Sequence, residues 1–167
     1  MEFTFNRFFW QSKINLPAWS EFTKATATVL TFAPEGRDDA PLSAEELALV
    51  QWVSGHYAMQ KPTILAAVLE AYPEVRRHYF EDYDLEENEE DLPSIPTAEG
   101  LAQVIMLTDV FVPQISKDGV PYVGYQFSCE WDKEHGLGIL MHGSRIVEIG
   151  GADTAFTLWI AKNDLDT

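Results

Sequence analysis

Val123–Trp131, which reads VGYQFSCEW, is the stretch that decides the fold of this chain. Apolar residues at every second position alternate here with small or polar ones. This period of two is typical of a β-strand with one buried and one exposed face. The pattern predicts that Cys129 and Trp131 lie on the buried face. Two further apolar stretches, Leu137–Met141 and Arg145–Ile149, follow closely, and together the three predict an antiparallel β-meander.

Both connections of this meander carry turn residues. In the first, Asp132 can accept a hydrogen bond from a backbone N–H two residues on, and Gly136 can adopt the positive φ that ends a turn. For the second we expect a three-residue turn, His142–Ser144, because a two-residue turn would mix the faces of the two strands. With three residues, one face would carry Leu137, Ile139, Val147 and Ile149. Gly138 would allow another backbone segment to approach closely.

The middle of the chain has helical periodicity. Ser43 and Glu46 have the spacing of a capping box, in which each side chain satisfies a free backbone donor. Pro62 fits the first position of a second helix, so we expect two helices. Pro73 would kink the second one, or start a short third helix as far as Phe80. The apolar faces of the two main helices comprise Leu49, Trp52, Val53, His56 and Tyr57, then Ile64, Leu65, Val68, Leu69 and Tyr72.

The remaining segments complete the expected fold. Residues 1–33 are expected to be extended, because Lys24–Phe32 is rich in β-branched and aromatic residues. A short helix is expected at Ala155–Lys162, with Asp153 or Thr154 as its cap. The predicted fold class is therefore α+β in a single domain, residues 1–167. It has an antiparallel sheet of five or more strands, with the middle helices packed on one face.

The net charge of −16 is unevenly distributed along the chain. Glu81–Asp91 (EDYDLEENEED) holds eight of the 27 acidic residues and no basic one. We interpret residues 81–96 as an acidic loop. It is either a solvated linker or a surface that attracts a basic protein partner. Nucleic acid is not an expected partner, because phosphate contacts need a basic patch and the sequence has none.

Other features of the sequence bear on the compartment. The single cysteine cannot form an internal disulfide, so nothing indicates an oxidising environment. The first residues lack the basic and apolar regions of a secretory signal. The longest strongly apolar run, Ile64–Leu69, is far shorter than the roughly 20 residues of a spanning helix. We therefore expect a soluble cytoplasmic protein that does not enter a membrane.

Cys129–Gly138 (CEWDKEHGLG) concentrates the side chains that can carry chemistry. Three potential metal ligands could meet across the hairpin: Asp132, His135 and His142. Their spacing matches no zinc pattern. Oxygens of Asp132, Glu134 and Asp153 could hold a hard cation, but the spacing of a calcium-binding loop is absent. We therefore predict no resident metal and no cofactor.

The same segment offers candidates for catalysis and for binding. Glu134 or His135 could act as a base, with Asp132 or Asp153 orienting the imidazole. No nucleophile is evident, since Cys129 is expected to be buried. The structural alternative is that these residues only build a turn. The candidate binding residues are Trp131, Asp132, Glu134, His135 and Asp153.

Gly119–Asp164 closely resembles the C-terminal half of an uncharacterised bacterial domain-of-unknown-function family. The resemblance rests on Cys-x-Trp-Asp-x-Glu-His-Gly-Leu-Gly at 129–138 and on Arg-x-Val-Glu-x-Gly-Gly-Ala-Asp at 145–153. Ile14–Phe22 resembles the family's N-terminal Leu-Pro-x-Trp segment, whereas Ala25–Asp39 fits only loosely. The resemblance implies one integral domain and implies no particular activity.

Two functional hypotheses follow. The first is a small, acidic, non-enzymatic module that binds a basic protein, by analogy with bacterial immunity and inhibitor proteins that neutralise a toxin. The alternative is a hydrolase, or a protein that binds a small ligand or a metal, using Asp132, Glu134 and His135. This alternative requires a concave pocket and a shifted pKa at those residues.

Overall fold

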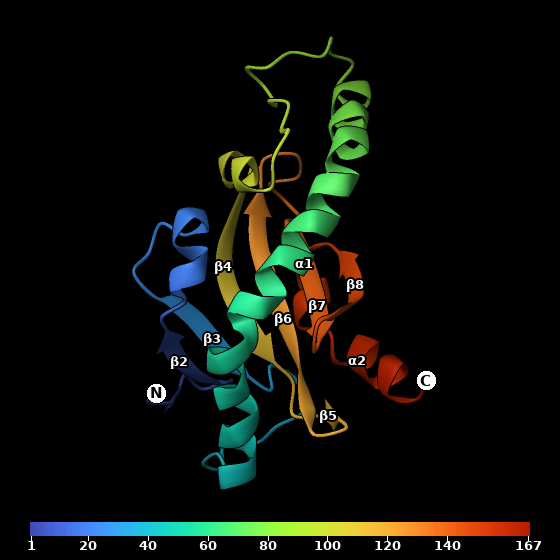
Figure 1. Cartoon of the computed structure of the whole chain (residues 1–167). Coiled ribbons are helices and arrows are strands. Elements are labelled where there is room, and N and C mark those ends of the chain that lie inside the picture. The colour runs from blue at the N-terminus through green and yellow to red at the C-terminus, as the bar shows by residue number, and fades with distance from the viewer.

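The structure is a computed structural model that describes residues 1–167, and it contains one eight-stranded sheet crossed by a long helix (Figure 1). The strands run in the order β1-β2-β3-β4-β6-β7-β8, with β5 paired to β6. Every pairing is antiparallel except β3 with β4. The fold is therefore α+β, as predicted. The strands are β1 (Thr4–Phe5), β2 (Trp10–Ile14), β3 (Thr28–Phe32), β4 (Ile105–Val112), β5 (Ser116–Lys117), β6 (Val120–Cys129), β7 (Leu137–His142) and β8 (Arg145–Gly150).

The C-terminal strands β6, β7 and β8 form the predicted antiparallel meander. The alternation along β6 also has the predicted faces, since Tyr125, Phe127 and Cys129 are buried in the main core. Trp131 lies just beyond the strand and is half-buried against that core. Its position at the rim leaves part of the indole free to line a cleft.

One continuous helix, α1 (Ala44–Asp82), replaces the two or three helices expected from the sequence. Its capping box, Ser43 with Glu46, is confirmed. Pro62 and Pro73 lie inside the helix, and both are exposed. The expectation of a break was wrong, because buried residues before and after each proline, among them Val53, Ile64, Tyr72 and Phe80, belong to the same core cluster. At the exposed positions, water can replace the lost backbone hydrogen bonds.

The connection between β7 and β8 also differs from the expected one. Only two residues lie between the paired His142 and Arg145, so the predicted three-residue turn is wrong. Gly143 has a φ of 59°, which suits the first position of a two-residue hairpin turn. A register shift between Leu140 and Met141 then pairs Ile139 with Ile149. As a result, Val147 packs on the opposite face of the sheet, and Ile149 is 41% exposed.

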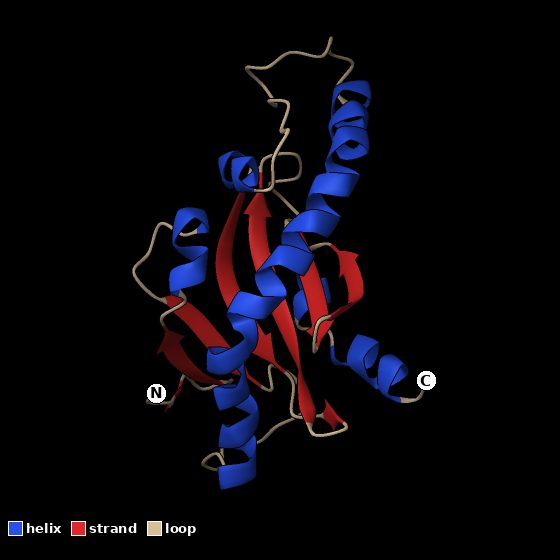
Figure 2. Ribbon diagram, in the orientation of Figure 1, coloured by secondary structure: helices blue, strands red, loops and turns tan.

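The opposite face of the sheet is covered by the 3₁₀ helix η3 (Ala152–Ala155) and by α2 (Leu158–Leu165) (Figure 2). The helix from the middle of the chain covers one face, as predicted, whereas the C-terminal helix α2 begins later than expected. Gly124 and Gly138 explain how η3 fits. A Cβ at either position would overlap the backbone of residues 151–155, so the close approach expected at Gly138 is confirmed.

The acidic loop begins two residues later than predicted, because α1 continues to Asp82. Arg76 holds this loop against the end of α1. Its guanidinium donates to the carbonyl oxygens of Leu92 and Asn88 at 2.8 and 3.1 Å, and to the Glu87 carboxylate at 2.9 Å. Leu92 itself is fully buried. The acidic loop is thus held at the projecting end of α1 (Figure 1).

Two further 3₁₀ helices connect the strands: η1 (Pro17–Phe22) and η2 (Glu99–Gln103). Trp19 and Phe22 of η1 are buried, and the Trp19 ring packs against Phe22 and against Tyr125 and Phe127 of β6. None of the helices combines the length and the hydrophobicity that crossing a membrane requires.

Candidate functional site

The turn between β6 and β7 is organised by Asp132. Its Oδ1 accepts a hydrogen bond from the backbone N–H of His135 at 3.0 Å, and its carbonyl oxygen accepts one from Gly136 N–H at 2.9 Å. Gly136 has a φ of 67°. The predicted turn is therefore confirmed, although the side-chain bond reaches three residues on instead of two.

Asp132 also holds the imidazole of His135. The Nδ1 atom of His135 lies 3.0 and 3.1 Å from the two carboxylate oxygens. The backbone hydrogen bond from His135, followed by the contact with its ring, lowers the pKa of Asp132 below the usual range. The carboxylate is thus ionised at neutral pH, but both of its oxygens are already engaged. The His135 side chain remains 69% exposed.

The other predicted residues take different positions. Glu134 is exposed, and Asp153 is exposed on η3. His142 lies at the far end of β7, where its Nε2 is 3.0 Å from the Lys117 carbonyl oxygen. The proposed meeting of Asp132, His135 and His142 was therefore wrong, because the length of a strand separates them. In this structure no three His, Cys, Asp or Glu side chains form a group that could hold a metal ion.

Cys129 is buried, as expected. Its Sγ donates to the Asp132 carbonyl oxygen across 3.4 Å. Burial raises the pKa of the thiol to about 11, so the group is protonated at neutral pH. A protonated, enclosed thiol is a poor nucleophile. Cys129 therefore contributes to the packing of the turn and not to its reactivity.

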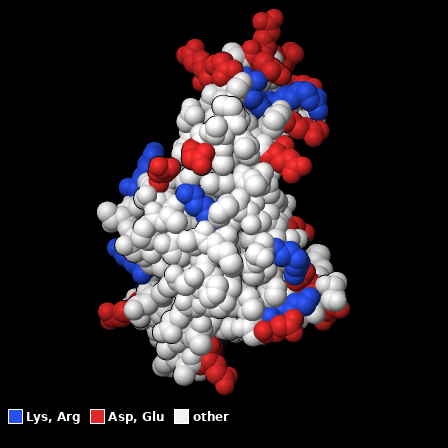
Figure 3. All heavy atoms as spheres, in the orientation of Figure 1, with Lys and Arg blue, Asp and Glu red and all other residues white.

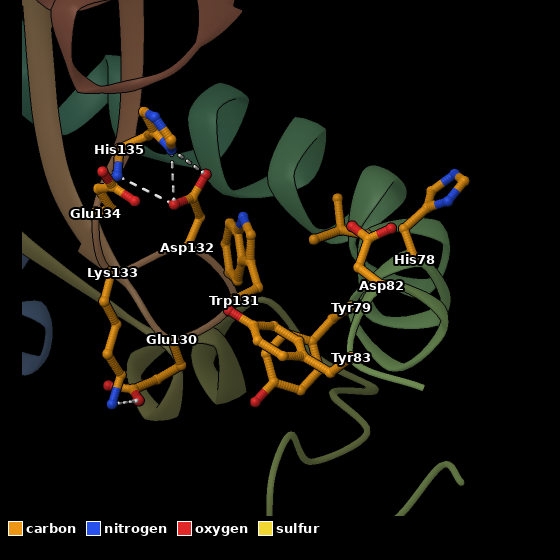
Figure 4. A pocket seen from close by; sticks show the side chains of 11 residues that line it. His78, Tyr79, Asp82, Tyr83, Glu130, Trp131, Asp132, Lys133, Glu134 and His135 are labelled. Carbon is orange, nitrogen blue, oxygen red and sulfur yellow. Dashed lines mark hydrogen bonds and ion pairs between the residues drawn. The ribbon is translucent and has the colours of Figure 1, made fainter. Parts of the chain in front are cut away.

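A cleft of about 800 Å³ separates this turn from the last turns of α1 (Figure 4). The indole of Trp131 points into it from one side, and Tyr79 and Tyr83 face it from the other. We call it the aromatic–acidic cleft. Its lining consists of Val75, His78, Tyr79, Asp82, Tyr83 and the six residues Glu130–His135.

The half of the aromatic–acidic cleft that α1 supplies was missed from the sequence. Tyr79 and Tyr83 are one helical turn apart, with ring centroids separated by 4.9 Å. That spacing was visible, but nothing in the sequence indicated that it would face Trp131. The indole also contacts Tyr72 in the core, with centroids 5.8 Å apart. Packing of α1 on the sheet therefore creates this part of the site.

Carboxylates outnumber cations in the aromatic–acidic cleft. Lys133 is its only lysine or arginine, and its ammonium is paired with Glu130 at 3.1 Å. The carboxylate of Asp132 contacts the imidazole of His135 at 3.0 Å. The carboxylates of Asp82 and Glu134 make no ion pair or hydrogen bond with the other residues of the cleft (Figure 4). The cleft thus presents aromatic rings beside two free negative charges.

A second cleft, of about 830 Å³, lies on the other side of the turn. Gly150, Gly151, Asp153 and Phe156 line it, together with Trp131 and other residues of the turn. Asp153 therefore faces this second cleft and not the aromatic–acidic one. The second cleft therefore brings together all five predicted binding residues: Trp131, Asp132, Glu134, His135 and Asp153. All of them except Asp153 also line the aromatic–acidic cleft.

The chain is thus a single α+β domain with two clefts, one on each side of the turn between β6 and β7. The chain belongs to a family characterised by a domain of unknown function, DUF6985, whose family model matches residues 1–156. The sequence resemblance to such a family is confirmed, and the matched residues end before α2. No curated protein and no solved structure matches the chain.

Proposed function

We propose that this protein is a non-enzymatic module that binds a basic protein, and that the partner docks at the acidic end of the molecule. The acidic end comprises Glu81–Asp91 together with Glu130–Glu134. Its function would be like that of an inhibitor or immunity protein, which acts by occupying a surface of its target. This analogy is one of charge and size, and it assigns no particular target.

The observation that carries this proposal is the convergence of two acidic segments that lie about 40 residues apart in the sequence. Asp82 of the first segment and Glu130–Glu134 of the second line the same cleft. In the space-filling view, acidic atoms gather over the end of α1 and its loop (Figure 3). Concentrated charge of one sign accelerates encounter with a partner of opposite sign and disfavours partners of like sign.

The hydrolase alternative has less support. The Asp132–His135 pair has the contact that orients a catalytic imidazole. However, one oxygen of that carboxylate also caps the turn, and the neighbouring thiol of Cys129 is buried and protonated. A triad-like mechanism needs a nucleophile within hydrogen-bond reach of its base. The Asp132–His135 contact is better explained as part of the turn.

The proposal can be tested by affinity capture from native lysate of the source cell, using the whole chain as bait. Wild type is expected to retain a partner of basic isoelectric point at about 0.05 M salt and to release it near 0.5 M, as screening shortens the range of charge. The test variant is Asp84→Asn/Glu86→Gln/Glu90→Gln, which neutralises three exposed carboxylates of the acidic end. It should retain several-fold less partner.

A matched control removes the same amount of charge elsewhere. Glu2→Gln/Asp39→Asn/Asp166→Asn changes three exposed acids that lie outside the acidic end. This control should capture the partner as well as wild type does. Equal losses in both variants would mean that net charge alone matters. Equal capture by all three baits, or by none of them, would count against docking at the acidic end.

A further inference from the structure

We propose that the aromatic–acidic cleft receives an arginine side chain of the basic partner. This inference rests on the proposed function and specifies the contact that it makes. The three aromatic rings of the cleft would face the guanidinium, and the free carboxylates of Asp82 and Glu134 would balance its charge. The surrounding acidic end would then supply attraction at longer range.

The aromatic residues provide surfaces suited to a flat cation. Tyr83 is 64% exposed although it is a large aromatic residue, and its ring lies against Tyr79. Trp131, on the facing side of the cleft, is held by its contact with Tyr72. An arginine guanidinium stacks on such rings and is weakly hydrated, so it loses little solvation on entering. A neutral apolar side chain could stack on the rings but would form no ion pair or hydrogen bond with the carboxylates.

The charges beside these rings are arranged to accept a cation. Glu130 and Asp132 already have partners within the chain, at 3.1 and 3.0 Å. Asp82 and Glu134 stand on opposite sides of the cleft and have none there (Figure 4). A guanidinium offers five N–H donors in a planar fork, so it can bond one carboxylate with two donors while its flat face stacks on a ring. A single ammonium would match this arrangement less well.

The openness of the cleft favours a protein side chain over a free small molecule. Small-ligand sites normally enclose most of the ligand's surface. Here Lys133, Glu134, Asp82 and Tyr83 are all exposed, so a small ligand would remain largely solvated. A side chain carried on a folded partner suits such a site, because the rest of the interface holds it in place.

The test uses the whole chain and two peptide probes, Ac-Gly-Arg-Gly-Arg-Gly-amide and its citrulline analogue, which has the same shape without the charge. Binding is measured by titration at low salt, and the indole N–H resonance of Trp131 is followed by NMR. The arginine peptide should bind and shift that resonance, whereas the citrulline peptide should do neither. In Asp82→Asn/Tyr83→Ser, binding should be roughly five- to tenfold weaker, as expected for one cation–π contact and one charge.

The matched control is Glu2→Gln/Phe8→Ser, which also removes one carboxylate and one exposed aromatic ring. Phe8 and Tyr83 are 71% and 64% exposed, so replacing either ring leaves the core intact. Equal weakening by the two pairs, or an unshifted Trp131 resonance, would overturn the arginine site. The capture experiment would then test the proposed function independently of the arginine site. Absence of any binding to the arginine peptide would overturn the arginine site as well.

Discussion

At the residue scale, one carboxylate has two structural tasks. Asp132 caps the turn through the His135 backbone N–H, and it fixes the direction of the His135 ring. The cap is internal to the turn, whereas the ring is mostly exposed. A hydrogen bond to a backbone donor that would otherwise be unpaired contributes about 0.5–1.5 kcal/mol, while an exposed ion pair contributes little. The cap is therefore the more important of the two contacts for stability.

We predict that Asp132→Ala lowers the free energy of unfolding by about 0.5–1.5 kcal/mol, because it removes the cap. His135→Ala should change it by less than about 0.5 kcal/mol, because the backbone bond remains. Urea denaturation of both variants measures this difference. Equal losses would show that the ring contact, and not the cap, holds the turn.

A second carboxylate, Asp164, connects α2 to the sheet. It accepts two hydrogen bonds from Arg145, at 2.9 and 2.7 Å, and one from the Tyr122 hydroxyl at 2.8 Å. The Arg145 bonds, then that of Tyr122, lower the pKa of Asp164 to about 2. The side chain is only 12% exposed, so solvent screens this cluster less than a surface pair.

We predict that Asp164→Asn lowers the free energy of unfolding by about 1–2 kcal/mol at neutral pH. Because the folded-state pKa lies below the unfolded value of about 3.9, this stabilisation is present above about pH 4. It is lost as the pH falls toward 2. Urea denaturation of wild type and variant between these limits should show the two curves converging in acid. A constant difference would contradict the assignment.

Single residues could be predicted from the sequence where their role is local. Asp132 and Gly136 were placed correctly, because a turn depends on neighbouring residues. His142 was placed wrongly in the candidate site, since its distance from His135 depends on the full length of β7. The contribution of Tyr79 and Tyr83 was missed for the same reason, because it depends on how α1 lies on the sheet.

At the element scale, α1 shows how packing overrides a local signal. Proline inside a helix costs about 3 kcal/mol relative to alanine, and two prolines suggested separate helices. The buried residues on both sides of Pro62, among them Val53 and Ile64, pack into the same core. Burying each such side chain gains about 1.5–3 kcal/mol. This gain exceeds the cost of the prolines, and it keeps the helix continuous.

We predict that Pro62→Ala stabilises the protein by about 1–3 kcal/mol, because it restores a backbone hydrogen bond at an exposed position. The measurement is the urea midpoint, with Pro73→Ala made in parallel. Destabilisation by either change would mean that α1 needs its proline to follow the sheet.

The sheet shows a comparable limit of local inference. Alternation along β6 predicted its faces correctly, but the bulge in β8 could not be seen in the sequence. The two-residue turn at Gly143 is favourable by itself, and the bulge then realigns Ile139 with Ile149. Likewise, the glycines at 124 and 138 could suggest close approach without identifying η3 as the approaching segment.

At the scale of the whole molecule, charge is concentrated where α1 extends past the sheet. Arg76 fixes the acidic loop there, and the turn after β6 brings further carboxylates to the same cleft. Like charges held together destabilise the folded chain. The proposed binding function would explain why they are retained at one end, because functional surfaces often reduce stability.

We predict that Asp84→Asn/Glu86→Gln/Glu90→Gln raises the urea midpoint at low ionic strength, because it relieves this repulsion. The difference from wild type should shrink near 1 M salt, where the screening length falls to about 3 Å. The control variant Glu2→Gln/Asp39→Asn/Asp166→Asn should show a smaller increase. Identical urea midpoints for wild type and both variants at low salt would indicate that repulsion within the acidic end does not destabilise the fold.

The most direct test of the account is hydrogen–deuterium exchange of the chain alone and in complex with its captured basic partner. Docking at the acidic end predicts slower exchange in residues 75–91 and 130–135, which surround the aromatic–acidic cleft. The strands β1 and β2, at one edge of the sheet, should exchange as they do in the free chain. Protection confined to β1 and β2, or to α2, with residues 75–91 and 130–135 unchanged, would contradict the account.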